Sequence, residues 1–234
     1  MKRLFLLLLL IPVLSGCGVI QINSGSKTSS TAPAPGFYRS SDRGDTWSAK
    51  TSVYSVGGEG KSFSGSSVIA MTIDPTDEKT IYVGTADKGL LYTTNSGDSW
   101  FYTLLGQGVI NGVAVDPSDR CTLYAAVFNK LYKSIDCARE WKVVHLSSLE
   151  GEYFTSVVVD PLNSRTVYLG TQRATLLRSL DAGFSWEAIK FFPSPIAKII
   201  VNPKNDQRLI VATVSAGIFQ SDDAGLNWLN LKEK

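Results

Sequence analysis

The chain has 234 residues, of which 44% are hydrophobic, with 23 basic and 21 acidic side chains. This composition is that of a globular protein with a substantial core, and it excludes a disordered chain. Two of the basic residues, Lys2 and Arg3, precede an apolar leader, and without them the chain carries 21 basic against 21 acidic residues. A neutral mature chain has no basic surface for phosphates, so we expect no nucleic-acid partner.

The chain begins with a predicted export signal. Lys2 and Arg3 are followed by an apolar run over residues 4–14, which is too short to cross a bilayer as a mature helix. The next residues, LSGC at 14–17, resemble the lipobox of bacterial lipoproteins. The resemblance implies that residues 1–16 are removed as a signal peptide and that Cys17 is lipidated. An ordinary signal peptide followed by a chance cysteine is the alternative.

This resemblance also implies a location. We expect an extracytoplasmic protein whose membrane partner is the bilayer that holds its lipid anchor. Gly18, not Asp, follows the cysteine, which suggests the outer membrane if the host has two membranes.

A polar segment follows the cysteine. Ser, Thr, Ala and Pro dominate residues 17–36, which therefore read as a lipidated N-terminus and flexible tether. Alternatively, Val19, Ile20 and Ile22 form a short strand within it. The remaining residues, 37–234, are the predicted globular domain.

Four similar segments begin at Val68, Val109, Phe154 and Ile196. Each holds two β-branched runs separated by an Asp-Pro or Asn-Pro turn, then a third short run, another turn and a Trp. The equivalent turn residues are spaced by 42, 44 and 42 positions, and they are Asp74, Asp116, Asp160 and Asn202. This pattern predicts four short strands in each repeat and no helix.

Five turns share the pattern Ser/Thr-x-Asp-x-Gly-x-x-Trp, which resembles the Asp box, or BNR repeat, of sialidases and related propellers. The hydroxyl and carboxylate can bind turn amides, Gly permits a positive φ, and Trp buries apolar surface. Asn95 replaces Asp in the second turn and Ala138 replaces Gly in the third. We expect a structural role for all of the box residues: Ser40, Asp42, Gly44, Trp47, Thr93, Asn95, Gly97, Trp100, Ser134, Asp136, Trp141, Ser179, Asp181, Gly183, Trp186, Ser221, Asp223, Gly225 and Trp228.

These repeats predict an all-β fold, a β-propeller of four complete four-stranded blades plus an N-terminal half-blade at residues 37–52. The repeat resembles those of the photosystem II assembly-factor group and of Vps10/sortilin-type propellers, which by itself carries no function. No inner strands precede the half-blade, so we expect an incompletely closed ring. Its open edge predicts self-association or completion by a partner.

Two cysteines fall within the second complete repeat. Cys121 and Cys137 are expected to face one another across the base of a hairpin, and in an oxidising compartment this predicts a disulfide. The bridge would stabilise the one box that lacks Gly. Two free thiols are the alternative, and a metal site is not expected.

The box turns lie on one face of such a propeller, and in the families it resembles ligands generally use the opposite face. Long loops on that opposite face are where function usually sits. They carry the residues that we expect to form a binding rim: Lys88, Phe128, Lys130, Glu150, Tyr153, Arg173, Phe191 and Phe192.

The sequence offers little for catalysis. Sialidases bind their substrate with three arginines, and here only Arg173 is expected on the rim. His145 has no evident catalytic or metal partner and is interpreted as a strand-surface residue. We expect no catalytic residues and no cofactor. The sequence therefore favours a non-catalytic, lipid-anchored propeller that binds a protein or an envelope polysaccharide, as an assembly or scaffold factor. A carbohydrate-active enzyme or lectin of the sialidase-like or glycosidase type is the alternative.

Overall fold

A computed structural model describes residues 34–55 and 60–231. The predicted signal peptide, the lipidation site at Cys17 and the predicted tether up to residue 33 lie outside the described residues. Within those ranges, no helix has the length and hydrophobicity needed to cross a membrane.

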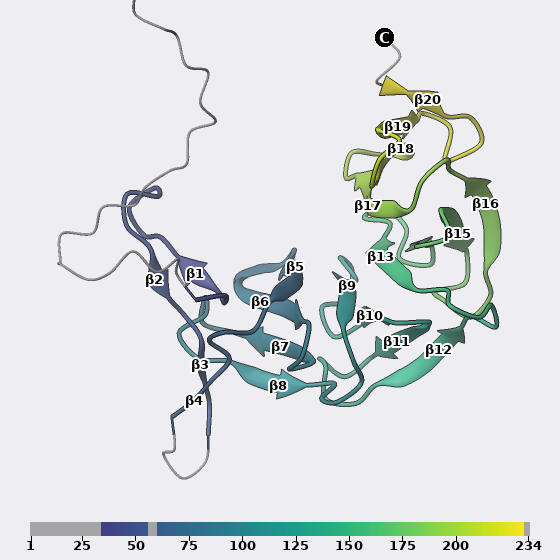
Figure 1. Ribbon diagram of the computed structural model, residues 1–234. Helices are drawn as coiled ribbons and strands as arrows, with labels where there is room; N and C mark the ends of the chain where they lie inside the picture. Colours follow the sequence, from purple (N-terminus) through teal and green to yellow (C-terminus); the bar gives the residue numbers. More distant parts are fainter. Residues whose placement is uncertain (1–33, 56–59, 232–234) are drawn as a thin grey trace, which may run out of the picture. The chain divides into compact units, whose positions relative to one another are not determined.

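Four antiparallel four-stranded sheets make up most of the described chain (Figure 1). In each sheet the strands follow one another in chain order, which confirms the predicted all-β propeller arrangement with four complete blades. The first blade is β5 (Val68–Asp74), β6 (Asp77–Thr85), β7 (Leu90–Thr93) and β8 (Phe101–Thr103); the second is β9 (Ile110–Val115), β10 (Leu123–Val127), β11 (Lys130–Ser134) and β12 (Lys142–Leu146). The third is β13 (Phe154–Val159), β14 (Val167–Thr171), β15 (Thr175–Ser179) and β16 (Glu187–Phe191); the fourth is β17 (Ile196–Asn202), β18 (Asn205–Thr213), β19 (Ile218–Ser221) and β20 (Leu229–Asn230).

Two short hairpins precede the first complete blade, the first of them within the predicted half-blade at residues 37–52. β1 (Tyr38–Arg39) pairs with β2 (Ser48–Ala49), and β3 (Ser52–Val53) pairs with β4 (Lys61–Ser62). They cover Trp100 of the first blade, whose indole N–H donates to the Lys50 carbonyl oxygen at 2.8 Å. The ring of Phe63, which is fully buried, meets Trp100 edge-on with centroids 5.4 Å apart. Phe63 is therefore part of the core between these hairpins and the first blade.

Consecutive blades pack through their inner strands. β5 contacts β9, β9 contacts β13, and β13 contacts β17. The apolar clusters lie between neighbouring sheets; one of them joins Ala114 of the second blade to Val157 and Val159 of the third. In the described residues no hydrogen-bonded strand pairing joins the fourth sheet to the first, so the propeller is not closed by hydrogen bonds.

The five Trp-containing turns repeat two hydrogen bonds from backbone N–H groups, one to the Ser or Thr hydroxyl and one to the Asp or Asn side-chain oxygen, and in the first, fourth and fifth turns the Trp indole also donates to the Gly carbonyl oxygen. In the fourth, the Gly183 N–H donates to Ser179 Oγ at 2.8 Å and the Ser185 N–H donates to Asp181 Oδ1 at 2.8 Å. The Trp186 indole N–H then donates to the Gly183 carbonyl oxygen at 3.1 Å. The third turn holds Ala138 at a φ of 67°, in the left-handed region that favours glycine.

Candidate functional site

Two exposed aromatic rings stand on the face opposite the Trp-containing turns. Phe128 occupies the turn between β10 and β11 and is 42% exposed; Tyr153 directly precedes β13 and is 41% exposed. Their ring centroids are 5.9 Å apart, with the planes inclined by 55°. The Phe154 N–H donates to the Phe128 carbonyl oxygen at 2.7 Å, which ties the two segments together.

The position of the Phe128 ring depends on its neighbour and on its backbone. Phe128 has a φ of 49°, an uncommon value for a residue with a side chain. A Cβ atom added to Gly108 would lie 1.9 Å from Phe128 Cε2, so only glycine fits beneath the ring. The chain therefore maintains a strained backbone at an exposed aromatic residue, a combination common at binding sites.

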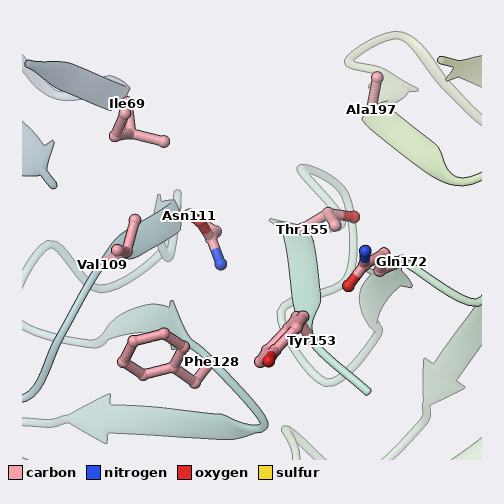
Figure 2. Close-up of a pocket in the computed structure, with 8 residues that line it drawn as sticks. All are labelled: Ile69, Val109, Asn111, Phe128, Tyr153, Thr155, Gln172 and Ala197. Atoms are coloured by element: carbon pink, nitrogen blue, oxygen red, sulfur yellow. The ribbon is translucent and has the colours of Figure 1, made fainter. Parts of the chain in front are cut away.

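A cavity of about 430 Å³ opens beside the two rings (Figure 2). Its walls come from the beginnings of the inner strands and from the loops that enter them. None of its lining residues is charged: they are Ile69, Val109, Asn111, Phe128, Tyr153, Thr155, Gln172 and Ala197. The Thr155 hydroxyl is shielded from solvent and has no hydrogen-bond partner among the described residues, which leaves it free to bind a ligand group.

A second cavity, of about 480 Å³, shares Phe128 and Tyr153 with the first. It is lined by the loop of residues 147–152 together with Gln107, Asn129 and Lys130. Two carboxylates, Glu150 and Glu152, belong to this lining. Glu152 is only 5% exposed and accepts a hydrogen bond from the Ser147 hydroxyl. The aromatic pair thus separates a neutral cavity from one that carries charge.

The structure brings together five of the eight residues of the predicted rim. Phe128, Lys130, Glu150 and Tyr153 line the second cavity, and Arg173 lies beside it, donating to the Glu150 carbonyl oxygen at 2.6 Å. Lys88 lines neither of these cavities and pairs with Asp87 at 3.6 Å.

The two neighbouring phenylalanines of the predicted rim, Phe191 and Phe192, point to opposite sides of the sheet. Phe191 is 69% exposed but lines neither cavity. The expectation for Phe192 is wrong, because it is 6% exposed and packs against Phe219 and Trp228. Adjacent strand residues point to opposite sides, so one of the two faces the core.

His145 is not a surface residue as expected. Its ring is half-buried between Phe154 and Trp186, at centroid distances of 5.4 and 5.3 Å. Burial lowers the pKa of His145, which favours the neutral imidazole. The residue thus serves packing between the second and third blades.

Sequence reasoning missed four polar groups of the site. Asn111 is the second residue of β9, and Thr155 is the second residue of β13. Gln172 directly follows β14, and Glu152 lies in the loop before β13. The only sequence signal for Asn111 and Thr155 is a polar residue at the start of an otherwise apolar inner strand, and Gln172 and Glu152 have no such signal.

The chain is similar to known β-propeller proteins, among them xyloglucanases. No family model matches the chain. It is 28% identical over 176 residues to the Xyloglucanase Xgh74A of Acetivibrio thermocellus, a match that spans 73% of this chain and 18% of that protein. The GH74 xyloglucanase from Xanthomonas campestris superposes with a TM-score of 0.60 and 22% identity, over 71% of this chain and 30% of that one. YCF48 from Cyanidioschyzon merolae superposes with a TM-score of 0.54 and 12% identity, over 70% and 55%.

The solved structures show the β-propeller fold. The similarity to enzymes corrects the function that we expected from the sequence. A non-catalytic propeller acting as an assembly or scaffold factor was favoured by the sequence. The similarity to xyloglucanases contradicts it and favours the carbohydrate-active alternative. The chain spans 18% of Xgh74A and 30% of the Xanthomonas campestris enzyme, at low identity, so what they share with it structurally is the propeller.

Proposed function

We propose that this chain is a carbohydrate-active propeller that binds a polysaccharide across Phe128 and Tyr153. The observation that carries the proposal is the exposed aromatic pair between two cavities, with ring centroids 5.9 Å apart. Aromatic rings pack against the C–H faces of sugar rings, while amides and hydroxyls bind the sugar hydroxyl groups. The similarity to xyloglucanases supports the same ligand class.

The charges of the site favour a neutral polysaccharide. The first cavity has no charged lining residue, so it provides no partner for a sugar carboxylate. The second cavity is lined by Glu150, Glu152 and Lys130, with Arg173 beside it, so it has no excess of positive charge to attract an acidic sugar.

Hydrolysis is a separate property of the same site. A glycosidase uses two carboxyl groups, one to protonate the leaving oxygen and one to act as base or nucleophile. Glu152, buried beside the aromatic pair, is the carboxyl group to test first, with Glu150 as its companion. The Glu152→Gln variant distinguishes hydrolysis from binding. It removes the acid that hydrolysis needs, and it retains most of the side chain's shape.

Binding can be tested by affinity electrophoresis in gels that contain xyloglucan, with polygalacturonate as the acidic comparison. We expect xyloglucan to retard the protein and polygalacturonate to leave it unaffected. Phe128→Ala and Tyr153→Ala should each weaken binding by about tenfold, because each removes a stacking surface. Phe191→Ala is the matched control, since Phe191 is exposed but outside both cavities. Equal retardation of the Phe128→Ala variant and the unmodified chain would contradict the proposal.

The membrane anchor is part of the same proposal. The LSGC sequence supports lipidation of Cys17 and an extracytoplasmic location, where polysaccharides of the envelope or the surroundings are accessible. Metabolic labelling with a radioactive fatty acid tests this. Label should appear in the unmodified chain and be absent from Cys17→Ser.

We also propose that Cys121 and Cys137 form a disulfide in the exported protein. Their proximity supports this, because their Cα atoms lie 3.8 Å apart and the Cys137 N–H donates to the Cys121 carbonyl oxygen at 3.0 Å. Closing a loop of this size stabilises a protein by about 3 kcal/mol. Cys137→Ser should lower the melting temperature under non-reducing conditions. Rapid alkylation of both thiols in native, unreduced protein would exclude the bridge.

A further inference from the structure

The first cavity lies where the four inner strands begin. The second residue of each inner strand lines it, and these equivalent residues are Ile69 in β5, Asn111 in β9, Thr155 in β13 and Ala197 in β17. The inner strands of a propeller surround its axis. One position of the repeat, contributed by all four blades, therefore borders a single cavity of about 430 Å³.

The four positions differ in polarity. Asn111 and Thr155, from the second and third blades, are polar, whereas the residues from the first and fourth blades, Ile69 and Ala197, are apolar. A third polar residue, Gln172, follows β14, the strand that pairs with β13. Figure 2 shows the three polar side chains between the aromatic pair on one side and the two apolar residues on the other. The cavity thus presents both polar and apolar surface to a ligand.

The polar residues are fixed by the segment that carries Tyr153. Asn111 Nδ2 donates to the Phe154 carbonyl oxygen at 3.0 Å, which orients the amide and leaves Oδ1 to accept from a ligand. The Gln172 N–H donates to the Tyr153 carbonyl oxygen at 2.8 Å. The polar side of the cavity is therefore tied to the aromatic pair, so a ligand that lies on the pair also lies next to these amides.

Thr155 carries a hydroxyl group that the folded chain leaves without a partner. Its Oγ1 atom is shielded from solvent and forms no hydrogen bond within residues 34–55 and 60–231. Such a group destabilises a protein, and valine would fill the same space without that cost. Because Thr155 also lines the cavity, a rotation about χ1 would bring the hydroxyl to a ligand there. The unpaired hydroxyl thus points to a role in binding and not in folding.

We propose that this cavity holds one uncharged sugar unit of the bound polysaccharide, either a branch or a chain end. The inference rests on the proposed function and adds to it a subsite beside the aromatic pair. The rim of a sugar ring carries hydroxyl groups, which Asn111, Thr155 and Gln172 can bind, and its faces carry C–H groups, which pack against apolar side chains such as Ile69. The inner strands border the cavity, so a main chain lying on the aromatic pair reaches it through a branch or through its end.

Thr155→Val tests the subsite, because it removes the hydroxyl and keeps the shape of the side chain. We expect the affinity for a xyloglucan heptasaccharide, measured by titration calorimetry, to fall by about tenfold. The melting temperature should not fall, since no hydrogen bond within the described chain is lost.

Thr103→Val is the matched control. The Thr103 hydroxyl donates to the Ala138 carbonyl oxygen at 2.6 Å and accepts from the Trp141 indole N–H at 2.8 Å. This variant should have the opposite effect, with a lower melting temperature and an unchanged affinity.

Cellotetraose distinguishes a branch from a chain end, because it has the main chain of the heptasaccharide without its branches. If a branch occupies the cavity, Thr155→Val weakens binding of the heptasaccharide alone. If a chain end occupies it, the variant weakens binding of both oligosaccharides. Either result supports a sugar subsite in this cavity.

Two results would overturn the subsite. One is unchanged affinity of Thr155→Val for both oligosaccharides while Phe128→Ala still weakens their binding, which leaves the proposed polysaccharide site intact. The other is a lower melting temperature of Thr155→Val, which would assign the hydroxyl to the fold. Full affinity of both Phe128→Ala and Tyr153→Ala would instead contradict the proposed function itself.

Discussion

At the scale of single residues, the Trp-containing turns show how a polar side chain stabilises a turn without being buried. The Asp181 carboxylate accepts hydrogen bonds from the Ser185 N–H and hydroxyl, and these lower its pKa to about 2, from an ordinary value of 3.8. A carboxylate whose pKa is lowered by folding stabilises the protein above its unfolded pKa, and that contribution is lost as the pH falls through the folded value.

Asp181→Asn should therefore make the protein less stable near neutral pH, and the difference should shrink as the pH falls from about 4 to about 2. The amide oxygen of Asn can still accept the Ser185 N–H, as Asn95 Oδ1 accepts the Ser99 N–H at 2.9 Å in the second turn. Denaturant titrations at several pH values measure the difference in unfolding free energy. A difference that stays constant with pH would show that the charge of Asp181 has no part in it.

At the scale of elements, local patterns predicted what local forces determine. The alternating strands, the Trp-containing turns and the approach of Cys121 to Cys137 all follow from periodicity and hairpin register. The loops on the opposite face did not follow, because tertiary contacts decide them. Phe63 becomes core only because Trp100 lies above it, and Phe192 because the fourth blade covers it. Asn111 of the second blade converges with Thr155 and Gln172 of the third, which no local pattern encodes.

The β10–β11 turn allows a sharp test at this scale. Gly108→Ala should displace the Phe128 ring and weaken polysaccharide binding by about tenfold or more, because the new Cβ would overlap the ring. Gly106→Ala is the matched control: Gly106 also has a positive φ, of 69°, but nothing lies within 4 Å of its added Cβ. Titration of both variants with xyloglucan fragments, alongside their melting temperatures, separates the loss of the ring from general backbone strain.

At the scale of the whole molecule, polar side chains connect neighbouring blades, and one of these contacts involves a buried charge. The Asp74 side chain is fully buried, and its Oδ2 has no hydrogen-bond partner in the described chain and only Arg120 as an ion-pair partner. An uncompensated buried carboxylate oxygen is costly, whereas an exposed ion pair contributes little.

Arg120→Ala should consequently lower the free energy of unfolding by about 1–3 kcal/mol. Arg208→Ala, which removes an ion pair with Asp222 in which both side chains are about half exposed, should change it by less than about 0.5 kcal/mol. Equal effects of the two substitutions in chemical denaturation would show that Arg120 does not compensate Asp74.

The fourth blade, β17–β20, contacts the third and has no hydrogen-bonded neighbour beyond it among residues 34–55 and 60–231. In an array held together by nearest-neighbour contacts, an end unit frays first on heating. Phe128 and Tyr153 belong to the second and third blades, each of which has a neighbour on both sides. Fraying at the end of the array would thus leave the aromatic pair in place, so the proposed polysaccharide site would persist in a protein whose fourth blade has begun to unfold.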